Sequence, residues 1–147
     1  MQIIIDDSAL QQKLEDAADK LADTTQLMQR ISMTLLNVTE ENFNAEGRPK
    51  WAGLSTAYAA KRKAGKILQV SGQLAGSTTP FHGADYAGIG SNKVYAAIHQ
   101  FGGMAGRGHK VNIKARPYLP MDANGNLQQE AYVEVAETID LYLKSIL

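Results

Sequence analysis

An amphipathic stripe near the N-terminus constrains the fold most. Its residues follow one another at alternating steps of three and four, which places them on one side of a helix. They are Leu10, Leu14, Ala17, Leu21, Thr24, Met28, Ile31, Leu35 and Val38. No glycine or proline interrupts the chain before Gly47. The pattern predicts a helical element over residues 8–45, either as one long helix or as two joined by a kink near Asp23–Thr25, where short polar residues weaken helix propensity.

The residues before this stripe predict how the element begins. Met1–Ile5 is a short apolar run typical of an edge strand, and Asp7-Ser8 then offers a helix N-cap, with Gln11 in capping-box position. The stripe is narrow and long, so it either lies across the protein's own sheet or partly meets another subunit.

The middle and end of the chain predict short elements and a closing helix. Short helices are expected at 58–64, after Ser71-Gly72 and at 94–101, and an amphipathic helix is expected from Leu127. A hairpin is expected around 82–85, with edge-strand pieces at 111–113 and 117–119. The remaining segments are a loop at 51–54, a glycine-rich loop at 104–109 and a turn at 122–126. We therefore predict an α+β fold in which a long N-terminal amphipathic helix and a C-terminal helix pack around a small antiparallel sheet with a short central helix. At 147 residues the chain is predicted to be one domain, residues 1–147.

Composition narrows the functional classes. The chain has no cysteine, which excludes disulfides, thiolate zinc sites and cysteine nucleophiles. Its apolar runs are far shorter than a membrane span and its N-terminus lacks a signal-peptide pattern, so we expect a protein that is cytosolic when made and has no membrane partner.

Charge is balanced in total but unevenly distributed. Residues 47–120 hold eleven of the fifteen lysines and arginines but only one of the fifteen acids, Asp85. Such separation is typical of complementary surfaces between copies of one protein, or of a basic face for nucleic acid. Alternatively, the acidic helices cover the basic middle within one molecule.

Neither catalysis nor metal binding is indicated. His82, Asp85, His99 and His109 lack the spacing of a metal site. No nucleophile motif or paired carboxylates occur, so we predict no enzyme, no metal and no cofactor. The glycine-rich run at 102–108 resembles a phosphate-binding loop only weakly, because no lysine-serine pair follows it.

The stretch YAAIHQFGG at 95–103 has a structural interpretation. On a helix Tyr95 and His99 share one face, while Val94, Ile98 and Phe101 form the buried side. His99 at the helix C-terminus is predicted to donate a hydrogen bond to free carbonyls, and Gly102 or Gly103 to provide the reversal.

The order of several landmarks resembles the phage virion-morphogenesis (tail-completion) family of Mu-like and P2-like phages. The matching pieces are WAGLS at 51–55, KILQVSGQLAGS at 66–77, AGIGSNKVYAAIHQFGG at 87–103 and IKARPYLP at 113–120. Within them the structural motif residues are Trp51, Tyr95, His99, Phe101, Gly102, Gly103, Pro117 and Leu119. The long helical element before Phe43 is not part of the resemblance.

The resemblance implies a small non-catalytic α+β protein that acts late in phage or prophage assembly, in tail completion or head-tail joining. It implies a ring of identical subunits in contact with phage tail or neck proteins, made in the host bacterial cytoplasm and located in the virion tail or neck.

Five residues are candidate assembly or partner contacts: Arg107, His109, Lys110, Lys114 and Arg116. The glycine-rich loop at 102–108 is expected to line the ring or contact the adjoining tail component. The alternative is a solvated loop without a partner. A nucleic-acid-binding module using the basic middle segment is the alternative function, in which the basic side chains contact DNA phosphates without base specificity. For Arg116, a buried ion pair that fixes the following strand is a second interpretation.

Overall fold

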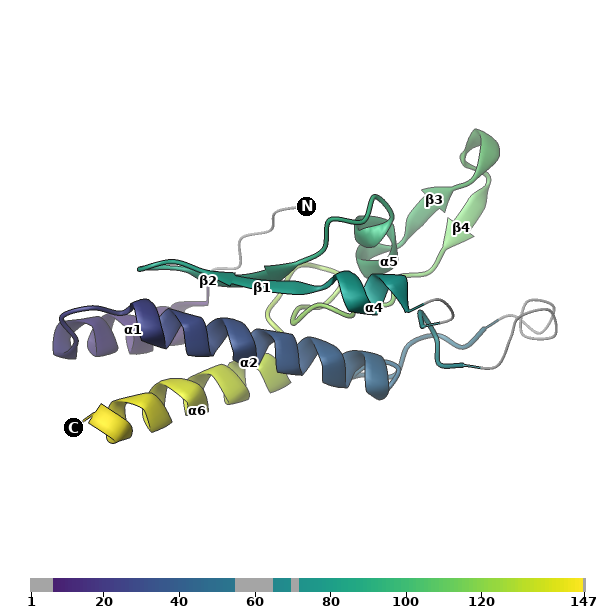
Figure 1. Ribbon diagram of the computed structural model, residues 1–147. Coiled ribbons are helices and arrows are strands. Elements are labelled where there is room, and N and C mark those ends of the chain that lie inside the picture. The colour runs from purple at the N-terminus through teal and green to yellow at the C-terminus, as the bar shows by residue number, and fades with distance from the viewer. Residues whose placement is uncertain (1–6, 55–64, 70–71, 147) are drawn as a thin grey trace.

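The helices from the two ends of the chain lie together in one layer, and the short strands and short helices of the middle portion lie on one side of it (Figure 1). The computed structural model describes residues 7–54, 65–69 and 72–146. In chain order the elements are α1 (Ser8–Lys20), α2 (Thr25–Asn44), α4 (Gln73–Ser77), β1 (Thr79–His82), β2 (Ala87–Gly90), α5 (Ala96–Phe101), β3 (Gly103–Ala105), the 3-10 turn η1 (Arg107–His109), β4 (Val111–Ile113) and α6 (Gln129–Ile146). The α+β prediction is confirmed.

The N-terminal helical element consists of two helices. Asp7 caps α1 by accepting a hydrogen bond from the backbone nitrogen of Leu10 at 3.0 Å. The helix ends at Lys20, and Asp23 accepts from the backbone nitrogen of Thr25 at 2.9 Å, where α2 begins. This side-chain bond competes with helix continuation, so the two-helix alternative holds. The strand predicted at 1–5 and the helix predicted at 58–64 lie outside the described residues.

The helices α1, α2 and α6 share one apolar core, and the β1–β2 hairpin lies along the other side of α2 (Figure 1). The buried residues of this three-helix core are Leu10, Ala17, Leu27, Met28, Ile31, Val135, Ile139 and Tyr142. The hairpin pairs Thr79 with Gly90 through His82 with Ala87, as predicted around residues 82–85. The turn predicted at 122–126 and the closing helix are also present. Periodic apolar spacing thus predicted the helical layer well.

A second core is centred on Tyr118, which is 0% exposed. The ring of Phe43 lies between Tyr118 and Trp51, at centroid distances of 5.2 and 6.0 Å. Burial raises the pKa of Tyr118 to about 12, and its hydroxyl donates to the carbonyl of Ala96 at 3.0 Å. Trp51 donates from Nε1 to the carbonyl of Pro117 at 2.9 Å.

The prediction of an edge strand at 117–119 is wrong. Among the described residues the segment pairs with no strand, and the side chain of Gln100 satisfies its backbone groups instead. The Gln100 Oε1 atom accepts from the backbone nitrogens of Tyr118 at 3.0 Å and Leu119 at 2.9 Å, and Nε2 donates to the carbonyl of Met121 at 3.1 Å. Proline at 117 and 120 removes two donors that a strand ladder would use.

A buried pair of amides joins α2 to the start of α6. Asn42 and Gln128 each donate to the other's side-chain oxygen at 2.9 Å. Asn42 also donates to the carbonyl of Tyr118 at 3.0 Å, and its oxygen accepts from Arg48 Nε at 2.9 Å. Both amides are therefore well satisfied despite burial.

The helix predicted at 94–101 begins two residues later, and its buried side was predicted wrongly. Val94 is 99% exposed and Phe101 is 37% exposed, whereas Ala96 and Gln100 are buried. The cause is a tertiary contact. The side of α5 that carries Gln100 faces the segment at 117–121, whose backbone groups form hydrogen bonds with the Gln100 amide. Hydrophobicity alone gives no sign of that contact.

His99 lies in the last turn of α5, as predicted, but its Nδ1 does not make the predicted side-chain hydrogen bond. Its ring meets that of Tyr95 edge-on at 5.8 Å, so the shared face is confirmed. The carbonyl of His99 accepts from the backbone nitrogen of Arg116 at 2.8 Å. Its buried Nδ1 has no hydrogen-bond partner among the described residues, so the predicted bond to helix-end carbonyls is not made there. Burial, together with the nearby charge of Arg116, lowers the pKa of His99 below its usual value.

Gly102 ends α5 in a conformation that requires glycine. Its φ is +73°, a region that side chains rarely adopt. A Cβ atom at this position would also lie 2.7 Å from the backbone nitrogen of Ala115 and 2.8 Å from the carbonyl of Ile113. The predicted glycine reversal is therefore confirmed, and it brings the two ends of the following hairpin together.

Replacing Gln100 with Ala is expected to destabilise the protein strongly, because the backbone groups of Tyr118, Leu119 and Met121 would be left buried and unpaired. We expect a loss of at least about 3 kcal/mol of unfolding free energy, measured by urea denaturation. The matched control is Gln29→Ala on the exposed side of α2, for which the change should stay within about 0.5 kcal/mol. Equal effects of the two substitutions would contradict the role given to Gln100.

The lowered pKa of His99 predicts a pH dependence of stability. As pH falls through about 6.5, the unfolded chain binds a proton at His99 that the folded chain does not, so unfolding becomes more favourable. This stability is present above that pH and decreases on acidification. The urea midpoint of wild type should therefore fall between neutral pH and mildly acidic pH more than that of His99→Gln. A His82→Gln control, at an exposed histidine, should retain the wild-type slope; retention of the same slope in His99→Gln would refute the prediction.

Candidate functional site

A β-hairpin, residues 103–113, extends from the rest of the protein and is called the arm here (Figure 1). Strands β3 and β4 pair antiparallel, with Gly103 opposite Ile113 and Ala105 opposite Val111. The prediction of a glycine-rich loop at 104–109 is wrong in part, because residues 104 and 105 belong to a strand and 107–109 form a 3-10 turn. Gly106 and Gly108 have φ values of +78° and +72°. The glycines serve a tight reversal between paired strands.

The surface of the arm is basic and partly apolar. Met104 is 50% exposed and Val111 is 52% exposed. Arg107 and Lys110 are exposed at the tip, and Lys114 is exposed just after β4. No acidic residue occurs between Gly103 and Lys114. Exposed apolar side chains combined with one sign of charge are typical of a contact surface.

The structure separates the five candidate contact residues. Arg107, Lys110 and Lys114 are exposed on or beside the arm. His109 lies in the 3-10 turn, and its side chain is outside the described part of the chain. The Arg116 guanidinium donates to the carbonyls of Ala52 and Gly53 at 3.1 and 3.2 Å. Arg116 thus fastens the base of the arm to the loop after Trp51.

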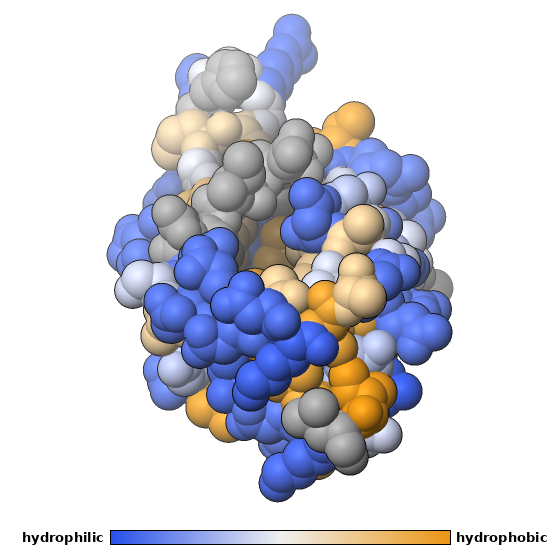
Figure 2. Space-filling model, turned by 90° about the vertical axis from the view of Figure 1, so that its left-hand side faces the viewer, coloured by the Kyte–Doolittle hydropathy of each residue, from blue (hydrophilic) through white to orange (hydrophobic). Residues whose placement is uncertain are grey.

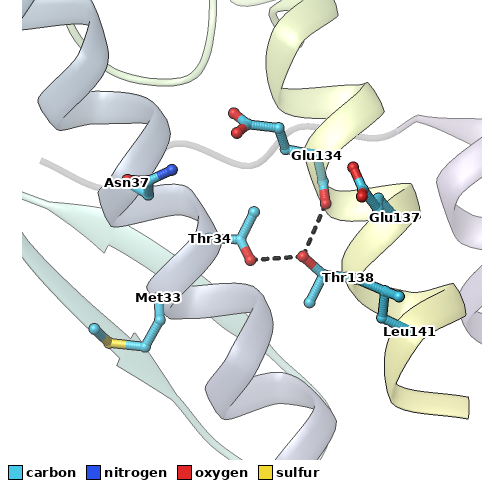
Figure 3. Close-up of a pocket in the computed structure, with 7 residues that line it drawn as sticks. All are labelled: Met33, Thr34, Asn37, Glu134, Glu137, Thr138 and Leu141. Carbon is cyan, nitrogen blue, oxygen red and sulfur yellow. Dashed lines mark hydrogen bonds between the residues drawn. The ribbon is translucent and has the colours of Figure 1, made fainter. Parts of the chain in front are cut away.

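A groove between α2 and α6 is a second surface feature, which the sequence analysis did not identify (Figure 3). It has a volume of about 300 Å³ and is lined by Met33, Thr34, Asn37, Glu134, Glu137, Thr138 and Leu141. The hydroxyls of Thr34 and Thr138 lie 2.7 Å apart and join the two helices, and Thr138 donates to the Glu134 carbonyl at 2.8 Å. The available signal was that Met33 and Leu141 are apolar but fall outside the two helical stripes.

The groove is acidic and has apolar margins. Burial raises the pKa of Glu134, and the nearby Glu41 carboxylate adds to this effect. The Oε2 atom of Glu134 is buried and has no hydrogen-bond partner among the described residues. Met33 and Leu141 are 52% and 58% exposed. Apolar surface also gathers at the end of the molecule where α6 ends (Figure 2). Opposite charges therefore occupy the arm and the groove.

Within one subunit, few of the basic residues of the middle segment form ion pairs with the acidic residues of the terminal helices among the described residues. Within the described ranges, an ion pair at 3.2 Å joins Arg48, from the basic middle, to Glu41 on α2. The other recorded pair, Lys13 with Asp140 at 2.7 Å, joins the two terminal helices to each other. The exposed basic residues of the arm take part in neither.

The described residues contain no group of three or more acidic or histidine side chains placed to hold a metal ion. None of the described helices combines the length and the apolar character needed to cross a membrane. The described surface has two prominent features, a projecting basic hairpin and an acidic groove.

Comparison with known proteins identifies relatives across most of the chain. The model of the phage virion morphogenesis family matches residues 5–144. The Mu-like prophage FluMu G protein 2 of Haemophilus influenzae is 40% identical over 112 residues, covering 74% of this chain and 77% of that protein. The "putative capsid assembly protein G" of Escherichia phage Mu is 34% identical over 147 residues, covering 90% and 92% of the two chains. No solved structure matches the chain.

The family match extends beyond the landmarks at 43–120 and includes the N-terminal helices and α6. These relatives and their names point to a structural protein of phage assembly rather than to an enzyme. The chain belongs to the phage virion morphogenesis family.

Proposed function

We propose that the protein acts in tail completion or head-tail joining, as a ring of identical subunits that binds phage tail or neck proteins. In this proposal it is made in the host cytoplasm and becomes part of the virion tail or neck. The observation that carries the proposal is the arm, whose exposed basic and apolar side chains extend away from the rest of the subunit (Figure 1).

A head-to-tail ring needs two different surfaces on each subunit. The arm and the α2–α6 groove are two such surfaces, and they differ in charge. A ring built this way requires no symmetric patch, and each subunit contributes one surface to each neighbour.

DNA contact is the second candidate, because Arg107, Lys110 and Lys114 are exposed on a segment without acids. Binding of this kind would rest on phosphate neutralisation and counterion release. Two observations weigh against it: the net charge of the chain is zero, and residues 103–114 contain no Phe, Tyr or Trp on which bases could stack. A salt titration with duplex DNA tests it, and absence of binding at low ionic strength would eliminate it.

The main test is complementation of a phage or prophage whose copy of this gene carries a nonsense mutation. Without the protein, electron microscopy of lysates should show tails that are unfinished or not joined to heads, and wild-type protein should restore plaque formation. Met104→Ser/Val111→Ser should fail to restore it, because these exposed side chains form the apolar part of the arm.

The matched control is Val94→Ser/Val133→Ser, which removes two valines that are 99% and 51% exposed elsewhere. It should complement like wild type, and both variants should melt at nearly the wild-type temperature. Normal, fully joined particles in the absence of the protein would overturn the proposed function. Full complementation by the arm variant would remove the arm from it.

A further inference from the structure

We propose that the arm of one copy binds the α2–α6 groove of the next copy, with Arg107 and Lys110 reaching Glu134 and Glu137. This inference rests on the proposed self-assembly and names its interface. The occupant of the groove is thus a second copy of this chain.

Free charges on the two surfaces support this pairing. Asp140 on α6 is engaged by Lys13 at 2.7 Å, and Glu41 on α2 by Arg48 at 3.2 Å. Glu134 and Glu137 form no ion pair with any cation in the described part of the chain. Among the described residues the two groove carboxylates therefore form no ion pair, and Arg48 is the only cation whose charge acts on Glu134 from nearby. The arm in turn carries exposed cations and no acid.

The apolar side chains are also arranged in a complementary way. In the strand register Met104 pairs with Asn112 and Val111 with Ala105. Since neighbouring positions of a strand face opposite sides, the arm has one exposed apolar side chain on each face. The groove has one on each wall, Met33 on α2 and Leu141 on α6 (Figure 3).

The size of the groove decides how the two surfaces meet. Its volume of about 300 Å³ accommodates a few side chains rather than a whole hairpin. The side chains at the tip of the arm would therefore enter it, while the backbone of the hairpin stays outside. The long stems of Arg and Lys pack on apolar margins as their charged ends reach carboxylates.

The arm cannot serve the groove of its own subunit in this conformation. In Figure 1 it points up and away from α2 and α6, on which the groove lies. Contact between arm and groove must then be intermolecular and head-to-tail, which leaves one free arm and one free groove on any open chain until a ring closes.

Charge exchange tests the contact. Self-association of purified wild type is measured by sedimentation and light scattering over a concentration series at low and high salt. Arg107→Glu/Lys110→Glu and Glu134→Lys/Glu137→Lys should each weaken association by about 100-fold, because like charges would then meet. The quadruple variant, which exchanges both surfaces, should associate like wild type.

The control is Asp19→Lys/Lys20→Glu, which exchanges charges at exposed positions at the end of α1 and should leave association unchanged. Circular dichroism checks that each variant is folded. A wild-type chain that stays monomeric throughout would overturn the inference, as would a quadruple variant as weak as either double variant.

Cross-linking provides a second test that does not depend on the charge variants being folded. Because the natural chain has no cysteine, disulfides can form only between introduced cysteines. The variant Asn37→Cys/Arg107→Cys places one thiol at the groove and one on the arm. Oxidation should give a ladder of covalent oligomers, whereas each single-cysteine variant can give nothing larger than a dimer. The control pair Asp19→Cys/Arg107→Cys should give no ladder, and absence of a ladder from the groove pair would contradict the contact.

The complementation assay separates failure of this interface from failure of the proposed function. If particles still require the protein but the charge exchange does not restore association, the interface is wrong and the assembly role stands. If particles form without the protein while the charge exchange works, the contact is real and the assembly role is wrong. A groove that instead takes a basic segment of another virion protein would leave wild type monomeric in solution, which the first measurement detects.

Discussion

The side-chain amide of Gln100 is the interaction on which the middle of the protein depends. It accepts two backbone hydrogen bonds and donates a third to the extended segment at 117–121. Because Gln100 belongs to α5, which precedes the arm, and the segment follows the arm, this one amide ties the two ends of the arm together. Asn42 continues the connection to α2 through the carbonyl of Tyr118. Buried polar groups thus fix geometry here, where an apolar contact would leave backbone groups unpaired.

Much of the fold could be predicted from the sequence because its pattern is local. The stripe from Leu10 to Val38, the hairpin around residues 82–85 and the closing helix follow from residue spacing and turn chemistry alone. The break between α1 and α2 was open between two alternatives, and the Asp23 side chain decides it. The reversal at Gly102 also followed from local chemistry, since only glycine fits there.

The errors share one physical origin, which is that long-range partners determine burial. Nothing in the sequence pattern marks Gln100 for burial, although it is 0% exposed, and helical spacing predicts Val94 on the buried side, although it is 99% exposed. Pro117–Leu119 resembled a strand because nothing in its own letters shows that a glutamine supplies its hydrogen bonds. Charge distribution alone predicts the basic side chains of the candidate site. It cannot predict the groove, because the groove exists only once α2 and α6 lie side by side.

The way the arm is attached also separates two kinds of change open to this protein. Its base is fixed by Gly102, Gln100 and Arg116, whereas Arg107 and Lys110 at its tip are exposed. Substitutions or insertions at the tip therefore alter the surface offered to a partner with little cost in folding stability. Substitutions at the base alter stability and leave the chemistry of the tip intact. Residues that determine the binding partner can consequently change at a different rate from residues that determine the fold, within one short chain.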